Sequence, residues 1–418
     1  MRKTIWRNSV LLLLLCSSGL AQGPQPWTWE KVVQRFEASN PNLLAGELNI
    51  DESKANEITA YLRPNPGLTL AGDQIDPFNA GPDHGPFAYF LPLASFSYLH
   101  EREHKRELRL ESAQKATDIA TSTQADLERT LLFNLRNAFV QILQAKAVYG
   151  VARENLSYYD KVLNVSTEQF KAGDISQVDL DRLELQRVQY ESDLQNAIVS
   201  LRTSKIQLLT LLDERTPVDQ FDVFGLFDFT EQLPPLNDVR KLAMDTRPDL
   251  KAAMEAVEKA KADHKLAIAD GSTDPTFGLD VGRNPPIDLY FGVSVNIPLR
   301  IFDRNQGEKR RTELDVDRNQ RLLEASQLQV FSDVDSAYTA VDGTLALLRP
   351  YRAKYLQQAV RVRDTITFAY QHGGASLLEF LNAENDYRSV ELSYVNLIGS
   401  YLTAAGQLNL SVGREVIP

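Results

Sequence analysis

The sequence is nearly devoid of cysteine, and beyond its first residues it has no apolar run long enough to cross a membrane as a helix. The single cysteine, Cys16, lies close to the N-terminus, so a chain processed beyond it would have no disulfide and no cysteine metal site. No glycine-rich phosphate loop or serine nucleophile elbow occurs. If this chain enters a membrane, it must therefore do so by strands.

The N-terminus has the order of a secretory signal. Basic residues, an apolar core and small residues follow one another as Arg2, Lys3 and Arg7, then residues 10–15, then Gly19-Leu20-Ala21. This order predicts a signal peptide over 1–21, cleaved after Ala21. The alternative is a lipid anchor on Cys16, favoured by the following serines but not by the two preceding leucines. Removing three basic residues changes the net charge from −11 to about −14, which argues against a nucleic-acid partner.

The rest of the chain is a duplication. Three landmarks recur in the same order: Pro41-Asn42-Leu43 as Pro248-Asp249-Leu250, Pro92-Leu93 as Pro298-Leu299, and Phe170-Lys171-Ala172-Gly173 as Tyr370-Gln371-His372-Gly373. A repeat of this size indicates the architecture before any single residue does. It predicts a first repeat over 22–230 and a second over 231–418.

Each repeat contains a predicted β-hairpin. Apolar and polar residues alternate on both sides of the turn at 283–286, which predicts a hairpin over about 275–299. The first repeat is less regular, and its hairpin is placed at about 66–98 mainly by position. The strands have about the length a tilted membrane strand needs, but four strands are too few to close a membrane barrel. Several copies of the chain would have to share one barrel, unless the sheet is an ordinary soluble one.

Very long helices follow each hairpin. We expect helices over about 107–170 and 308–370, each roughly 95 Å long, and shorter return helices over 176–212 and 376–410. Coiled-coil spacing runs along both long helices, as Leu132, Leu135, Phe139, Ile142 and Tyr149, and as Phe331, Val334, Tyr338, Val341, Leu345 and Leu348. We expect Pro350 to kink the second long helix. The segment 213–235 is expected to link the halves outside the resulting tube.

In both repeats, the chain resembles the TolC-like outer membrane efflux proteins. The run from Pro298 to Gly307, PLRIFDRNQG, is similar to the strand-to-helix junction of the subgroup with heavy-metal channels such as CzcC and CusC. The resemblance implies a mainly α fold with a small β part: long coiled-coil helices and β-hairpins that form a trimeric α-barrel tunnel with a shared 12-stranded transmembrane β-barrel. It also implies an outer membrane location with a periplasmic tunnel.

The resemblance further implies a function and its partners. The chain would be a passive conduit in a tripartite efflux system, carrying metal cations or small toxic molecules. It would work as a homotrimer surrounded by outer membrane lipid, with a periplasmic adaptor and an inner-membrane efflux pump. Such a conduit needs no catalytic residue and no cofactor.

Residue by residue, the resemblance places a periplasmic gate at the helix turns. The gate positions correspond to Asp174, Asp179, Tyr370, Glu379 and Asn382, and the adaptor-docking turns to Gly173, Gly373 and Gly374. The arginine that partners the tyrosine in some members would fall at Ala375. Three copies of Glu379 would form a carboxylate ring that favours cations. The alternative is that these acids only stabilise helix N-termini.

Two other functions fit parts of the sequence. His100, Glu101 and His104 match H-E-x-x-H, the zinc-peptidase pattern, although no third ligand stands out and the flanks at Lys105, Arg106, Glu107 and Arg109 favour a solvated charged surface. A secreted coiled-coil adhesin or adaptor without a pore would also explain the heptad helices. Two hairpins at matching positions favour the channel over the adhesin.

Overall fold

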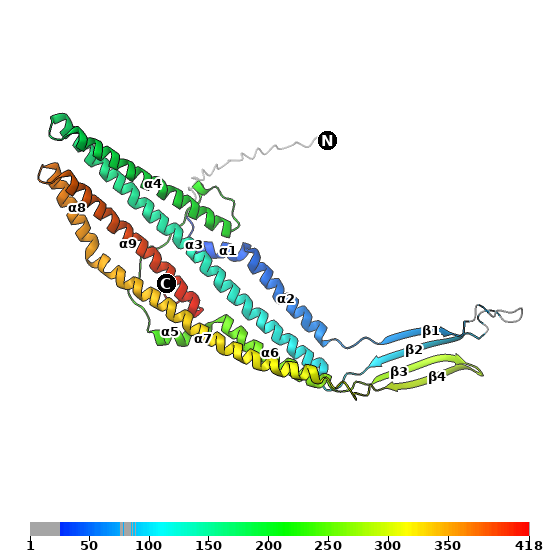
Figure 1. Cartoon of the computed structure of the whole chain (residues 1–418). Coiled ribbons are helices and arrows are strands. Elements are labelled where there is room, and N and C mark those ends of the chain that lie inside the picture. Colours follow the sequence, from blue (N-terminus) through cyan, green and yellow to red (C-terminus); the bar gives the residue numbers. More distant parts are fainter. Residues whose placement is uncertain (1–25, 76–77, 79–84, 86, 88, 418) are drawn as a thin grey trace, which may run out of the picture.

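The computed structural model describes residues 26–75, 78, 85, 87 and 89–417. The expected signal peptide and Cys16 lie outside these residues. Long helices form one elongated body, and a β-sheet extends from one end of it (Figure 1). None of the helices in the described ranges has the length and apolar character needed to cross a membrane.

The two repeats have the same order of elements. The first contains α1 (Trp29–Ser39), α2 (Pro41–Tyr61), β1 (Gly67–Asp73), β2 (Leu91–Leu99), α3 (Lys105–Ala172) and α4 (Gln177–Leu211). The second contains α5 (Leu236–Thr246), α6 (Pro248–Asp270), β3 (Thr276–Asn284), β4 (Ile287–Asn296), α7 (Gln306–Pro350), a π-helical turn (Tyr351–Tyr355), α8 (Leu356–Gln371) and α9 (Leu377–Val412). A short 3₁₀ turn (Val218–Gln220) lies in the linker. The expected fold class, mainly α with a small β part, is confirmed.

Local chemistry sets where these helices begin. Pro41 and Pro248 each occupy the first turn of a helix, where the missing N–H would have had no partner. The Asn40 side chain accepts hydrogen bonds from two backbone N–H groups at the start of α2. Ser176 and Ser376 cap α4 and α9 in the same way, so the return helices begin at equivalent points of the two repeats.

The four strands form one antiparallel sheet in the order β1-β2-β3-β4. The two hairpins meet in register along β2 and β3, where Phe96 faces Leu279. Large apolar side chains on β1 and β4 are exposed: Leu68, Leu70, Phe291 and Val293 have exposed fractions of 68–88%. The outer edges of β1 and β4 have no partner strand in the described chain. The sheet therefore presents apolar side chains and two open edges to its surroundings.

Each repeat has its own core at the middle of the helical body. In the first, α1, α3 and α4 pack around Phe36, Leu135 and Ile142; in the second, α5, α7 and α9 pack around Val334 and Tyr401. These cores follow the predicted heptad positions on α3 and α7. An exception on α7 is Phe331, which is 40% exposed.

Two features differ from the sequence expectations. The short helices α1 and α5 were not anticipated. The linker 213–235 is not peripheral to the packing, because Phe221, Val223 and Phe229 are buried in the two cores. The kink expected at Pro350 is confirmed: the chain widens into the π-helical turn there, and α8 continues in a changed direction (Figure 1).

Candidate functional site: the paired helix turns

The turns that join α3 to α4 and α8 to α9 lie at the same end of the molecule, opposite the sheet (Figure 1). Gly173 and Gly373 both adopt a left-handed backbone, with φ of 87° and 72°. The following residues, Asp174 and Gly374, donate their N–H groups to the carbonyls of Gln169 and Ala369. Both long helices thus end in the same glycine-dependent turn. A hydrogen bond of 2.9 Å from Gln169 Nε2 to the Gln371 carbonyl connects the two turns.

Glu379 lies in the first turn of α9 and closes a capping box with Ser376. Its Oε2 accepts hydrogen bonds from the Ser376 N–H and hydroxyl, both at 2.8 Å. The Glu379 N–H donates in return to Ser376 Oγ at 3.3 Å. The Ser376 backbone and then its hydroxyl hold the pKa of Glu379 below its ordinary value. The side chain is exposed and carries a charge at neutral pH.

The other predicted acidic positions have different surroundings. Asp179, in the first turn of α4, accepts a hydrogen bond of 2.8 Å from the hydroxyl of Ser176. Asp174 is exposed at the first turn, and Asn382 is exposed on α9. Within one protomer, these side chains are separate rather than gathered into one cluster.

Tyr370 lies at the end of an aromatic stack that crosses all four helices. The stack runs from Tyr190 on α4 to Tyr159 on α3, then Phe380 on α9 and Tyr370 on α8, with ring centroids 4.6, 6.4 and 5.0 Å apart. Burial raises the pKa of the Tyr370 hydroxyl, and the nearby Asp179 charge adds to the shift. Tyr370 and Asp179, which belong to different hairpins, therefore lie within electrostatic range of each other. Ala375 packs against the stack.

Further from the turns, polar contacts also join the α3–α4 hairpin to the α8–α9 hairpin. The Tyr158 hydroxyl donates to Thr367 Oγ1 at 3.3 Å, and Arg388 binds Asp193 at 2.8 Å. These contacts join α3 to α8 and α9 to α4. The α8–α9 hairpin is therefore bound to the α3–α4 hairpin by both rings and polar groups.

The structure separates the H-E-x-x-H residues. His100 follows β2, while His104 precedes α3 with a left-handed φ of 56°. The Glu101 carboxylate accepts two hydrogen bonds from Arg109, at 2.5 and 2.9 Å. The two histidines consequently do not share a helical face, and among the described residues no group of three or more histidine, cysteine or acidic side chains could hold a metal ion. The expectation of a wholly solvated flank was wrong for Lys105, which is buried and bonded to Asp274.

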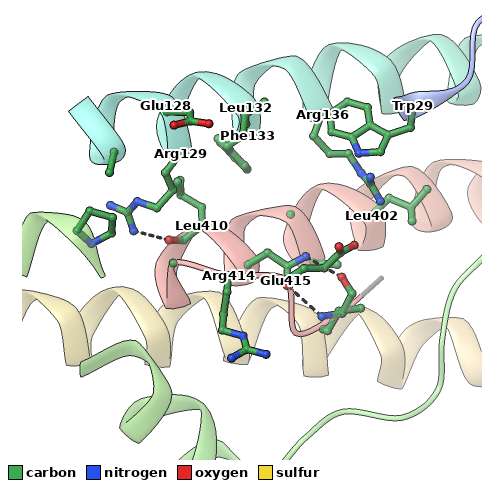
Figure 2. A pocket seen from close by; sticks show the side chains of 17 residues that line it. Trp29, Glu128, Arg129, Leu132, Phe133, Arg136, Leu402, Leu410, Arg414 and Glu415 are labelled. Carbon is green, nitrogen blue, oxygen red and sulfur yellow. Dashed lines mark hydrogen bonds between the residues drawn. The ribbon is translucent and has the colours of Figure 1, made fainter. Parts of the chain in front are cut away.

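A separate pocket of about 370 Å³ lies at the middle of the helical body, between α3 and the end of α9 (Figure 2). Residues that line this pocket are engaged in contacts with other parts of the protein. Arg129 donates to the Leu410 carbonyl at 2.5 Å, and the Arg136 guanidinium lies 4.8 Å from the Trp29 ring centre. None of the predicted site residues lines it.

The overall fold is that of known outer membrane channels. A solved structure of CusC superposes with a TM-score of 0.78 at 16% identity and covers 92% of both chains. The outer membrane protein VceC from Vibrio cholerae superposes with a TM-score of 0.75 at 15% identity, covering 92% of this chain and 96% of its own. At these identities, the superpositions show the fold.

The sequence comparisons find relatives of the same kind. The profile of the outer membrane efflux proteins matches residues 239–414, within the second repeat. CzcC, the cobalt-zinc-cadmium resistance protein of Cupriavidus metallidurans, is 23% identical over 93% of this chain and 90% of its own length. TolC of Escherichia coli is 20% identical over 96% of this chain and 84% of its own. The second repeat thus matches the outer membrane efflux protein family, in agreement with the resemblance seen in the sequence.

Proposed function

We propose that the chain is the outer membrane channel of a tripartite efflux system. It conducts passively, since the inner-membrane pump would supply the energy. The observation that carries this proposal is that one chain joins an apolar sheet with open edges to a body of long helices. Open edges and exposed apolar side chains call for partner strands and a lipid surrounding.

Three copies would satisfy both needs. Pairing β1 of one copy with β4 of the next would close a 12-stranded barrel in the outer membrane, with the helices forming a periplasmic tunnel. The turns at Gly173, Gly373 and Gly374 would then lie at the far end of the tunnel, where a periplasmic adaptor can dock. The names of two relatives, a cobalt-zinc-cadmium resistance protein and the pyoverdine export protein OpmQ, support metal cations or small toxic molecules as cargo.

The same arrangement would make the helix turns a gate. In a trimer, Glu379 would contribute three charges around a narrow opening, and such rings favour cations. Both hydrogen bonds from Ser376 use Oε2, so Oε1 is not engaged by any described residue of the protomer. Asp174, Asp179, Tyr370 and Asn382 would complete the gate region.

Conductance in planar bilayers tests the channel. We expect purified trimers to give discrete conductance steps that divalent cations modify. A secreted protein that gives no conductance, with no heat-resistant trimers recovered from outer membranes, would instead favour the adhesin or adaptor alternative.

Two variants separate the charge of Glu379 from its capping role. Glu379→Gln keeps a side chain that can bond Ser376 but removes the charge, and it should reduce cation selectivity several-fold. Ser376→Ala keeps the charge and removes the hydroxyl of the cap, so its selectivity should stay near that of the wild type. Unchanged selectivity and unchanged divalent block in Glu379→Gln would refute the gate assignment.

A further inference from the structure

The junction between the hairpins contains a buried carboxyl group, that of Glu384 on α9. This residue is only 4% exposed and lies one helical turn beyond Phe380 of the aromatic stack. Its Oε1 accepts a hydrogen bond, at 3.5 Å, from the hydroxyl of Thr367 on α8. Burial raises the pKa of Glu384 to about 7. A buried charge of this kind is costly unless a cation is paired with it.

The facing groups compensate this charge only in part. On α8, Arg363 and Asp364 act on Glu384 with opposite signs. Arg363 is itself engaged elsewhere, because it binds Asp364 at 2.8 Å and lies between the rings of Tyr158 and Tyr387, at 4.5 and 4.0 Å from their centres. Among the described ion pairs, its carboxylate partner is Asp364 and not Glu384.

The remaining neighbours carry no positive charge that is available to Glu384. On α3 and α4, the groups that face it are the hydroxyls of Tyr158, Tyr159 and Tyr190. On its own helix, Arg388 is bound to Asp193 of α4. Packing of the hairpins therefore favours the protonated form of Glu384.

We propose that Glu384 is a protonation switch for the packing of the α8–α9 hairpin against the α3–α4 hairpin. The hairpins pack closely while the carboxyl is neutral. Loss of its proton to solvent leaves an anion that is better solvated when the hairpins separate or admit water. If the turns are the gate proposed above, neutral pH would loosen the gate and acid would tighten it; this consequence rests on the proposed function, whereas the switch itself does not.

The sign follows from linkage between protonation and packing. An acid whose pKa is raised in the packed state binds its proton more tightly there than when it is solvated. Packing is therefore favoured fully below about pH 4.5, weakens as the pH rises to 7, and changes no further above that. Between pH 5.5 and 7.5, the equilibrium between packed and loosened hairpins should move on the order of twentyfold.

The duplication supplies a matched control. Glu184 occupies the same position after Ser176 that Glu384 occupies after Ser376, but it is exposed on α4. Glu384→Gln removes the titrating group with little change of shape, and Glu184→Gln removes an equivalent carboxyl from a solvated site. Glu384→Met provides a second neutral variant in case the glutamine variant does not fold, as judged by a cooperative thermal transition.

Hydrogen–deuterium exchange of the full-length protein in detergent measures the switch directly. After correction for intrinsic exchange rates, amides within 363–395 should exchange at least tenfold faster at pH 7.5 than at pH 5.5 in the wild type and in Glu184→Gln. Neither neutral variant at Glu384 should show this difference. A wild type without the difference, or a neutral Glu384 variant that keeps it, would overturn the proposal. Exchange does not measure conduction, so a failure of the channel proposal would leave this result standing.

Discussion

Replacing Arg247 with methionine should markedly destabilise the second repeat. Arg247 precedes α6, and its side chain is only 6% exposed. It binds Asp249 at 2.6 and 3.0 Å, Asp333 of α7 at 2.9 Å, and the carbonyl of Ser411 on α9 at 3.2 Å. One guanidinium thus joins α6, α7 and the end of α9 at the centre of the repeat.

The magnitude follows from what the substitution leaves behind. Removing one partner of a buried ion pair costs about 3–5 kcal/mol, because the other charge remains buried and unpaired. Asp249 and Asp333 are about a third exposed, at 35% and 31%, and Asp249 keeps Arg129 at 3.6 Å, so water and this second cation partly replace the lost one. We therefore expect a loss near the lower end, about 3 kcal/mol in the free energy of unfolding.

Urea denaturation followed by far-UV circular dichroism would measure this loss. The matched control is Arg240→Met on α5, because Arg240 also binds an aspartate of α7, Asp335, at 2.6 and 2.7 Å. That pair is solvated, so its removal should have little effect. Equal effects of the two substitutions would show that burial of Arg247 does not determine its contribution.

The pH dependence provides a second check on Arg247. Although burial acts in the opposite direction, the hydrogen bond and the charge of Arg247 hold the pKa of Asp249 below its ordinary value of 3.8. A lowered pKa stabilises the folded state above that value, and the contribution is lost as the pH falls through the folded pKa. The difference between wild type and Arg247→Met should accordingly shrink below about pH 3.8. A constant difference down to pH 2 would contradict the pairing.

Three further substitutions test other parts of the fold. Lys105→Met should cost about 3 kcal/mol in unfolding free energy, measured by urea denaturation, because it leaves the carboxylate of Asp274 without the cation 2.5 Å away; the loss should fade in acid as Asp274 is protonated. Gly173→Ala should cost about 1 kcal/mol by the same measurement, since nothing obstructs the added methyl group but φ is 87°. Tyr159→Leu should cost about 2–4 kcal/mol and increase amide exchange at the hairpin junction, because it interrupts the stack next to Phe380; unchanged exchange there would argue against the stack as a link between hairpins.

The sequence predicted those elements that a regular pattern encodes. Strands β3 and β4 follow from strict alternation, and the heptads marked the buried faces of α3 and α7, with Val334, Val341 and Leu345 fully buried. The helix α1 was missed because an 11-residue helix buries only Val32 and Phe36, which is too few positions to define a period. Its packing depends on α3, which lies about a hundred residues away in the chain.

Long-range pairing explains why the site was less predictable than the fold. The Ser376-x-x-Glu379 spacing alone indicates a capping box, since both partners lie in one helical turn. The aromatic stack could not be read in this way, because its four rings come from four helices. Lys105 is a second example. Its charged neighbours in the sequence suggest a solvated surface, but it is buried because Asp274 and the Ser272 carbonyl of the other repeat bind it.

Helix capping accounts for some of the acids near the two turns but not for all of them. Asp179 and Glu379 occupy the same position in the two repeats, and each bonds the serine that caps its helix. Helix capping is therefore sufficient to explain an acid at both places. Glu384 differs, because its repeat equivalent, Glu184, is exposed and no cap or ion pair requires a carboxyl at the buried position. A leucine or glutamine there would fold at lower cost, so the titrating group is the feature of this junction that packing alone does not explain.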